Sequence, residues 1–332
     1  MSSILYPLKF KPILKDRIWG GDKLQTRLNK NLNGRKNIGE SWELSGVDGS
    51  ISVVSNGFLQ GNDLNELIEI YMGDLVGERV YRKYGEEFPL LIKFIDANDD
   101  LSIQVHPNDQ LAAERHNSFG KSEMWYIMHA EPGAELINGF KDDTEPEQYK
   151  KALEDKSVLS LLASYQVNKG DVFFIPAGRV HAIGKGIMLA EIQQTSDLTY
   201  RIYDYDRTDD KGNKRDLHID EALDAINFKD THGHKLDYIT NENGASELCT
   251  SPFFSTYLLS IDKPIGRDYY HLDSFVILVC VEGEAEILFN NGQGIEIIRM
   301  GDTVLIPAEL NRIDLFTATG ARILEVHIPE EM

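Results

Sequence analysis

The stretch Gly170-Asp-Val-Phe-Phe-Ile-Pro-Ala-Gly-Arg-Val-His181 joins an apolar strand pattern to a Pro-x-Gly turn and ends in a histidine. A related stretch, Gly301-Asp-Thr-Val-Leu-Ile-Pro-Ala-Glu-Leu-Asn-Arg312, lies near the C-terminus. A second pair of matching segments precedes these stretches. Gly133-Ala-Glu-Leu-Ile137 precedes the first stretch, and Gly283-Glu-Ala-Glu-Ile287 precedes the second. Self-similarity of this kind indicates a repeated structural unit, so we expect one β-rich unit to be present twice.

The first unit is longer than the second because it contains a segment with helical character at about residues 145–165, where Pro146 suits a first helical turn. A second helical pattern follows Asp63 and spans about residues 62–85, and a third, short one follows Asp220. Other apolar segments are short, rich in β-formers and bounded by Gly, Asp and Asn, namely residues 51–54, 90–95, 101–105, 124–128, 135–137, 171–175 and 187–192. The sequence predicts a mainly β protein with helical insertions.

The composition narrows the class of protein. The 332 residues carry 54 Asp and Glu against 34 Lys and Arg, and the apolar content of 42% is sufficient for a packed core. No run of about 18 apolar residues predicts a membrane span, and residues 1–7 show no secretory signal. The two cysteines are too few for a disulfide framework, and the acidic surplus disfavours nucleic acid as a partner. We expect a cytoplasmic protein, and the sequence leaves its oligomeric state open.

Four polar residues in the first unit have the chemistry of metal ligands. Gln104 and His106 alternate along one strand and therefore share a face. Glu123 begins the next apolar strand, and His181 ends the Pro-x-Gly turn. Two imidazoles, a carboxylate and an amide oxygen form a mixed nitrogen and oxygen set that suits Zn²⁺, with Mn²⁺, Fe²⁺ and Co²⁺ as alternatives.

An isolated histidine is more often a surface group or a hydrogen-bonded interior group than a ligand. We assign that ordinary role to His116, His129, His232 and His234, which lack a neighbouring ligand pattern. For His106 and His181, residue spacing alone leaves the metal site and the ordinary role equally open.

The stretch at 170–181 resembles the second signature of the cupins, which are small jelly-roll barrels that hold a metal. The first signature is partial, because Gln-Val-His at 104–106 stands where His-x-His is usual. Over nearly its whole length the chain resembles the type I mannose-6-phosphate isomerase (phosphomannose isomerase) family in its short bacterial form. The runs that carry this resemblance are residues 10–21, 39–45, 89–97, 104–107, 121–123 and 191–207.

The resemblance implies two cupin-type jelly-roll barrels with helical insertions. Residues 1–240 would form the N-terminal catalytic barrel, with insertions at about 62–85 and 145–165. Residues 241–332 would form a degenerate C-terminal barrel, in which Arg312 stands where the first unit has His181. A guanidinium cannot ligate zinc, so we expect this second barrel to be free of metal.

The implied activity is that of a zinc-dependent aldose–ketose isomerase, which interconverts mannose 6-phosphate and fructose 6-phosphate through a cis-enediol. One Zn²⁺ per chain would be held by the residues that match the ligands of the family, Gln104, His106, Glu123 and His181. The partner is a small phosphosugar, with no nucleic acid and no membrane involved.

The resemblance also assigns the catalytic residues. Arg201 matches the catalytic arginine, and its alternative role is a surface ion pair with Asp197 or Asp204. The base stays open between a zinc-bound hydroxide, Lys121 and Glu191. Lys121 lies two residues before Glu123, so both would face one cavity on an extended strand, and its alternative role is that of a solvated lysine.

The family's phosphate-binding positions match Lys93, Ser102 and Arg207. Lys93 lies in an apolar strand, where a cation needs a partner, and Arg207 has an alternative role as an ion-paired turn residue. Trp19, Glu40 and Trp42 fall in family-typical runs, and we expect them to pack and to line the cavity.

Two other functions compete with the isomerase. One is a non-catalytic protein that binds sugar phosphates, and the other is an iron-dependent cupin oxygenase, since one fold hosts several chemistries. Replacement of one signature histidine by Gln104 and the presence of Arg201 disfavour the oxygenase.

Overall fold

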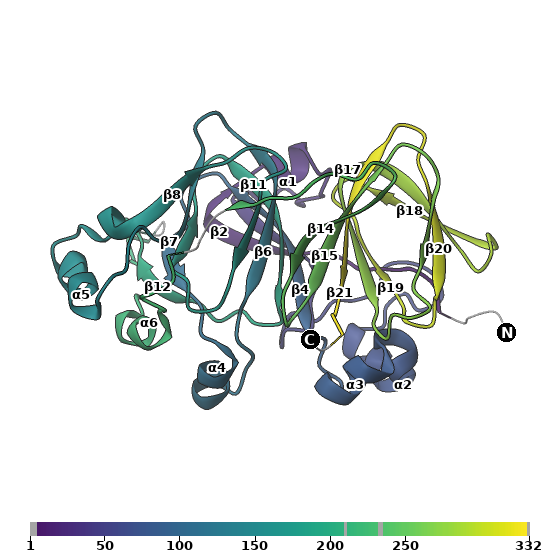
Figure 1. Cartoon of the computed structure of the whole chain (residues 1–332), viewed down its shortest axis with the longest axis horizontal. Helices are drawn as coiled ribbons and strands as arrows, with labels where there is room; N and C mark the ends of the chain where they lie inside the picture. Colours follow the sequence, from purple (N-terminus) through teal and green to yellow (C-terminus); the bar gives the residue numbers. More distant parts are fainter. Residues whose placement is uncertain (1–4, 209–210, 232–234, 331–332) are drawn as a thin grey trace.

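The computed structural model describes residues 5–208, 211–231 and 235–330. The chain is mainly β, as predicted, with antiparallel strands in two strand-rich halves that lie side by side (Figure 1). The described strands form three sheets, and none of their pairings closes a sheet on itself. The mainly β class is confirmed, and the jelly-roll description remains a prediction. No helix within the described residues is long and apolar enough to cross a membrane.

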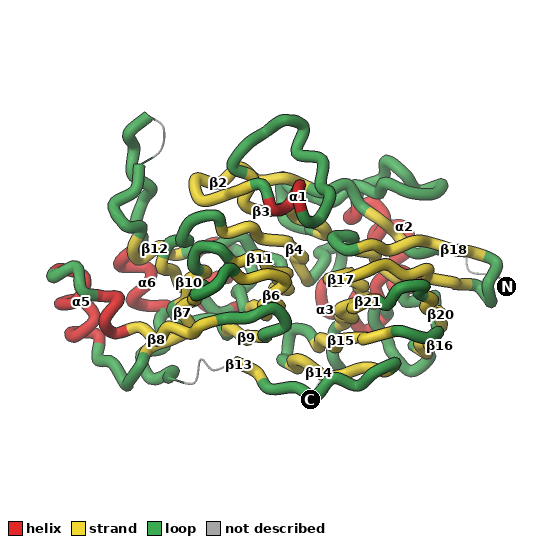
Figure 2. The backbone as a smooth tube through the Cα atoms, turned by 90° about the horizontal axis from the view of Figure 1, so that it is seen from above, coloured by secondary structure: helices red, strands yellow, loops and turns green. Residues whose placement is uncertain are grey.

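Two sheets build the N-terminal half. Figure 2 shows the strands of the larger one following one another across this half. In spatial order it contains β13 (Lys235–Leu236), β9 (Val172–Ile175), β6 (Glu123–Ala130), β11 (Ile187–Gln194), β4 (Leu90–Ala97), β3 (Ile38–Leu44) and β2 (Ile13–Gly21). The smaller sheet contains β12 (Tyr200–Tyr203), β5 (Ile103–Val105), β10 (His181–Ile183), β7 (Glu135–Phe140) and β8 (Leu162–Gln166). Because β4 and β11 are buried along their whole lengths, the polar residues they carry must be paired.

The third sheet forms the C-terminal half and includes one strand from the start of the chain. Its main path runs through β1 (Leu8–Lys9), β19 (Thr303–Ile306), β17 (Val276–Phe289), β21 (Ala321–His327), β15 (Ser255–Ile261) and β14 (Gly244–Thr250). Three further strands attach to it, β16 (Ile265–Asp268), β18 (Gly294–Arg299) and β20 (Arg312–Phe316). The repeat is visible in the register, because β6 pairs with β9 in the same antiparallel way as β17 pairs with β19.

The predicted insertion at about 62–85 forms α2 (Leu64–Val76) and α3 (Glu78–Tyr84). Asp63 caps α2 in a capping box with Glu66, in which each side chain bonds the other residue's backbone N–H. These helices lie against the C-terminal half (Figure 1), where the carbonyl of Leu75 accepts a 2.9 Å hydrogen bond from Ala308.

The other predicted insertion is helical only in its first part. Residues Pro146–Glu154 form α5 and Val158–Leu161 form a 3-10 turn, but residues 162–166 are β8, which pairs with β7. The helical prediction for 162–165 is therefore wrong, because pairing with a neighbouring strand outweighs a local pattern that either structure could bury. Residues 51–54 form only isolated bridges, and α6 (Ile219–Ala225) begins one residue before the predicted cap. The sequence analysis missed the short helices α1 (Lys23–Thr26) and α4 (Asp109–His116).

One hydrophobic core joins the two halves. Ile92 and Met124 of the N-terminal half belong to the same buried cluster as Leu67 of α2 and Val326 of β21. Two further clusters fill the N-terminal half, and one fills the C-terminal half.

Candidate active site

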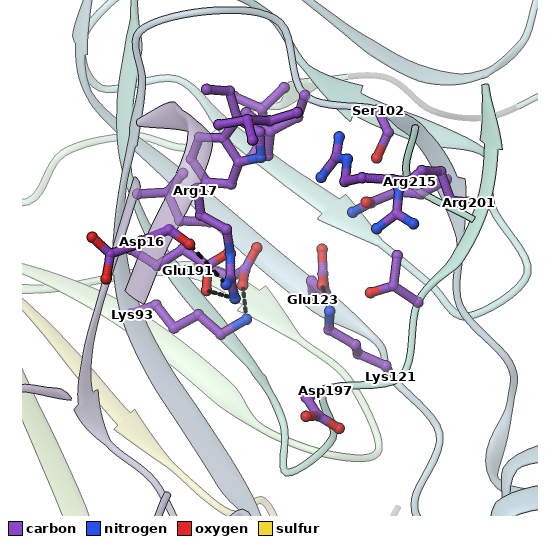
Figure 3. A pocket seen from close by; sticks show the side chains of 18 residues that line it. Asp16, Arg17, Lys93, Ser102, Lys121, Glu123, Glu191, Asp197, Arg201 and Arg215 are labelled. Carbon is purple, nitrogen blue, oxygen red and sulfur yellow. Dashed lines mark hydrogen bonds and ion pairs between the residues drawn. The ribbon is translucent and has the colours of Figure 1, made fainter. Parts of the chain in front are cut away.

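A cavity of about 460 Å³ opens into the N-terminal half. Its walls come from both sheets of this half, with residues from β2, β3, β4, β5, β6, β11 and β12 (Figure 3). Most of the residues that the sequence analysis selected line it, namely Lys93, Ser102, Gln104, Lys121, Glu123, Glu191 and Arg201. Residues from several distant segments therefore share one space.

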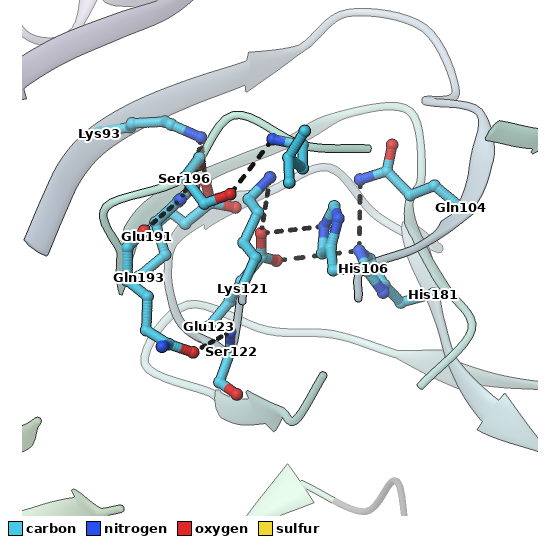
Figure 4. A network of polar contacts seen from close by, with 12 residues as sticks. Lys93, Gln104, His106, Lys121, Ser122, Glu123, His181, Glu191, Gln193 and Ser196 are labelled. Atoms are coloured by element: carbon cyan, nitrogen blue, oxygen red, sulfur yellow. Dashed lines mark hydrogen bonds and ion pairs between the residues drawn. The ribbon is translucent and has the colours of Figure 1, made fainter. Parts of the chain in front are cut away.

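His106 and His181 converge on Glu123 (Figure 4), which lines this cavity, whereas neither histidine is among its lining residues. The Nε2 atom of His106 lies 3.1 Å from Glu123 Oε1, and His181 Nε2 lies 3.8 Å from Glu123 Oε2. All three side chains are buried, and a ligand atom from each lies within 4.8 Å of the others. This spacing fits one metal ion bound by all three residues.

The pairing of strand β5 with strand β10 places Gln104 beside His181 of this cluster. Its backbone pairs with that of His181, and its amide nitrogen lies 3.2 Å from His181 Nε2. Rotation of the amide by half a turn would present its oxygen at the same place, where it can serve as a fourth ligand.

The protonation states suit metal binding. His181 Nδ1 lies 2.9 Å from the carbonyl oxygen of Arg179, to which it donates its proton, so Nε2 keeps a free lone pair. Burial lowers the pKa of His181, and burial with the nearby charge of Lys121 lowers the pKa of His106 to about 3. Burial opposes ionisation of Glu123, but Lys121 and His106 outweigh it and hold the pKa of this carboxyl well below its usual range.

Both ring nitrogens of His106 and Oε1 of Glu123 are buried and make no hydrogen bond with the described residues. Buried polar atoms are rarely left without a partner, and a metal ion would supply one for the imidazole and the carboxylate. The donor set of neutral imidazoles and an ionised carboxylate therefore fits a divalent ion.

Lys121 is buried, not solvated, and its Nζ lies 3.2 Å from Glu123 Oε1. A second charged group lies deeper on β4 and β11, where Lys93 Nζ is 2.8 Å from Glu191 Oε1. Trp125 Nε1 donates to the other oxygen of Glu191 at 2.9 Å. Burial, followed by the charge of Glu123, raises the pKa of Glu191. Lys93 thus has the partner that a buried cation requires.

Glu40 connects this group to the cavity wall. Arg17 binds it with two hydrogen bonds of 2.8 and 3.0 Å, and Trp42 Nε1 donates to it at 2.7 Å. Burial opposes ionisation of Glu40, but the charges of Lys93 and Arg17 prevail and lower its pKa to about 2. Trp19 and Trp42 are buried, as packing residues are.

Arg201 lies on β12 at the cavity edge. Among the described residues it makes no ion pair, and neither Asp197 nor Asp204 is its partner. Its Nη1 donates to the carbonyl of Asp216 at 2.8 Å, and its Nε is buried without a partner in the described part of the chain.

Arg207 does not line the cavity. It pairs with Asp204 at 2.6 Å and lies 3.7 Å from Asp99. Arg17 and Arg215 do line the cavity, and sequence reasoning missed both. Arg17 lies two residues before Trp19 in a family-typical run, which could have drawn attention to it. No pattern distinguishes Arg215 from other arginines in polar segments.

The histidines to which we assigned ordinary roles lie away from the metal cluster where they are described. His116 contacts the hydroxyl of Tyr200 at 2.8 Å, and His129 contacts Arg27 at 3.3 Å. His232 and His234 lie outside the described residues.

Comparisons with known proteins identify the family of the chain. A family model described as "Phosphomannose isomerase type I, catalytic domain" matches residues 7–122. A mannose-6-phosphate isomerase of Streptococcus mutans is 34% identical over 302 residues, which cover 91% of this chain and 92% of that protein. Mannose-6-phosphate isomerase ManA of Bacillus subtilis is 35% identical over 93% of this chain and 95% of its own length.

A solved structure agrees over the whole fold. The crystal structure of the mannose 6-phosphate isomerase from Bacillus subtilis matches with a TM-score of 0.86 at 29% identity, covering 97% of this chain and 99% of that one. The chain therefore belongs to the type I mannose-6-phosphate isomerase family.

Proposed function

We propose that this chain interconverts mannose 6-phosphate and fructose 6-phosphate with the help of one bound metal ion. The observation that carries the proposal is the convergence of His106 and His181 on Glu123, which lines a cavity together with Lys121 and Arg201. Relatives named for this activity match more than nine-tenths of the chain.

The metal we propose is Zn²⁺, with Gln104 as its fourth protein ligand. Two imidazoles and a carboxylate are usual zinc ligands, and a catalytic zinc keeps a position open to water or substrate. When bound, the ion would polarise the sugar oxygens at the reacting carbons.

The residues of the chain would support a cis-enediol route. Lys121 and Glu191 both face the cavity and are the side chains available to move a proton between C1 and C2. Arg201 carries a permanent charge, and its Nε has no partner among the described residues, which suits it to stabilise negative charge that develops on the sugar.

We further propose that residues 1–240 and 241–332 are two cupin-type jelly-roll barrels, the first catalytic and the second without metal. The shared register of the two repeats supports this division. In this shared register Val276 stands in the second repeat where Glu123 stands in the first, and valine cannot ligate zinc. The free, buried Cys249 and Cys280 suit a reducing cytoplasm.

The test combines metal analysis with a coupled assay for both sugar phosphates. We expect about one zinc per chain and turnover in both directions, with solvent deuterium entering the product in heavy water. Bound zinc without turnover would favour the sugar-phosphate-binding protein, and iron with oxygen consumption would favour the oxygenase.

The variant His181→Ala should lose bound metal and activity together, because it removes one of three converging ligands. His129→Ala is the matched control, since this histidine lies outside the metal cluster, and it should retain both. Full activity of the metal-free His181→Ala variant would refute the site.

A further inference from the structure

The charges around the cavity are separated into two groups. Figure 3 shows Ser102, Arg201 and Arg215 together on one side and Lys93 with Glu191 on the other, with Glu123 and Lys121 between them. A phosphosugar has one strongly anionic end, so the two sides are not equivalent for its binding.

The cations on the Lys93 side are already neutralised. Lys93 is 2.8 Å from Glu191, and Arg17 holds Glu40 through two hydrogen bonds. A phosphate dianion placed there would lie beside two buried carboxylates, and repulsion between like charges in a site of low polarity is costly.

The cations on the Ser102 side are less compensated. Arg201 contacts only a backbone carbonyl through its side chain, with Nε unpartnered in the described residues. Arg215 is held by Asp204, whose single negative charge it shares with Arg207. Burial, followed by the charge of Arg215, lowers the pKa of Arg201, so two guanidinium groups repel each other at this wall. An anion between them would relieve that repulsion.

Asp204 fixes the direction of Arg215. It accepts from Arg215 Nε at 2.8 Å and also from an Nη of the same side chain. Nη1 of Arg215 makes no hydrogen bond with the described residues, while the same guanidinium lines the cavity. Arg207 contacts Asp204, Asp99 and the carbonyl oxygen of Asp100, so its hydrogen-bonding capacity is used outside the cavity.

We propose that Arg215, held by Asp204, binds the phosphate of the substrate together with Ser102 at the Arg201 side of the cavity. Arg207 holds Asp204 in place from outside the cavity. Lys93, beside Glu191, would lie near the carbons of the sugar that react. This inference rests on the proposed isomerase function and deepens it, since it fixes which end of the open-chain sugar faces which wall.

The test is steady-state kinetics of Arg215→Gln in the metal-loaded enzyme. Loss of a charge-assisted hydrogen bond to phosphate should raise KM for both sugar phosphates about tenfold to a hundredfold, with kcat changed by less than about threefold. Inhibition by inorganic phosphate should weaken by a similar factor, and Arg215→Lys should recover part of the loss because it restores the charge. Bound metal and melting temperature should match the wild type.

Lys214→Gln is the matched control. It removes a positive charge from the neighbouring position, where Lys214 pairs with Asp206 and does not line the cavity, and it should leave KM unchanged. An unchanged KM for Arg215→Gln in an active enzyme would overturn the inference, and so would a larger rise in KM for Arg207→Gln. If the wild type turned over neither sugar phosphate, the proposed function would fail by itself. Calorimetric titration of both proteins with mannose 6-phosphate would then still test the role of Arg215. The wild type should bind mannose 6-phosphate more tightly than Arg215→Gln, and equal affinities, or no binding by either protein, would refute the inference.

Discussion

At the scale of single residues, side-chain chemistry predicted the cluster of His106, Glu123 and His181, but not all of the cationic residues that line the cavity. Gln104 and His106 were placed on one strand face by the alternation of a β-strand, and His181 by the turn that precedes it. These local rules suffice because the three residues lie on, or directly after, the paired strands β5 and β10. Arg215 was missed because its position depends on Asp204, a contact between side chains on an irregular segment.

Glu40 gives a prediction for pH dependence. Its folded-state pKa of about 2 lies below the ordinary value of 4.5, so its ionised form stabilises the folded chain. The stabilisation that the ionised Glu40 gives the folded chain is complete above pH 4.5 and disappears as the pH falls toward 2. Glu40→Gln should therefore cost about 3 kcal/mol of unfolding free energy at pH 7, and the cost should shrink as the pH falls from 4.5.

Urea unfolding of wild type and variant at pH 7, 4 and 3, after treatment with a chelator, measures this difference. Asp314→Asn serves as a control, because its ion pair with Arg312 is exposed and should change stability by less than about 0.5 kcal/mol. A cost for Glu40→Gln that is the same at all three pH values would contradict the prediction.

At the scale of elements, the two repeats share strand order but differ in what their inward faces carry. Glu191 pairs in register with Lys93 on β4, and Glu325 pairs with Tyr257 on β15. Sequence alignment of the repeats places Arg312 opposite His181, whereas Arg312 is exposed and the buried Ile313 pairs with Arg267. The sequence could not reveal that the side chain of Arg312 faces outward, because side-chain direction depends on register.

A hydrogen-bonded network in the C-terminal half surrounds Glu325, which stands in the register where the N-terminal half has Glu191. Glu325 is buried, accepts two hydrogen bonds from Arg267 at 2.9 and 2.6 Å, and accepts a third from the hydroxyl of Tyr269 at 2.7 Å. Glu325→Ala should destabilise the protein by about 2 to 3 kcal/mol, less than for a fully buried pair because Arg267 is partly exposed.

Thermal unfolding and metal analysis of this variant check the prediction. The metal content should stay at the wild-type value, since Glu325 lies on β21 of the C-terminal half and the metal cluster lies in the N-terminal half (Figure 1). Glu247→Ala, which changes an exposed position on β14, is the control and should have little effect. Loss of metal from Glu325→Ala would contradict this prediction, because it would show that the C-terminal half influences metal binding in the N-terminal half.

At the scale of the whole molecule, sequence reasoning found the repeat but not how closely its two parts are joined. Strand β1 comes from the start of the chain and pairs with β19 near its end. The insertion of α2 and α3 lies in the first part of the sequence but packs on the C-terminal half. Such contacts are non-local and leave no periodic signal, so local patterns cannot predict them.

The shared core predicts that the two halves unfold together. Buried residues from both halves form one cluster, and hydrogen bonds such as Phe275 N–H to the carbonyl of Val76, at 3.1 Å, cross between α2 and the C-terminal half. Differential scanning calorimetry should therefore give one transition, with similar calorimetric and van't Hoff enthalpies. A chelator should lower its midpoint as a whole, because a ligand bound only by the folded state stabilises every part that unfolds with its site. Glu325→Ala should lower the same single midpoint from the other half, whereas two transitions, of which only one responds to the chelator, would show that the halves unfold independently.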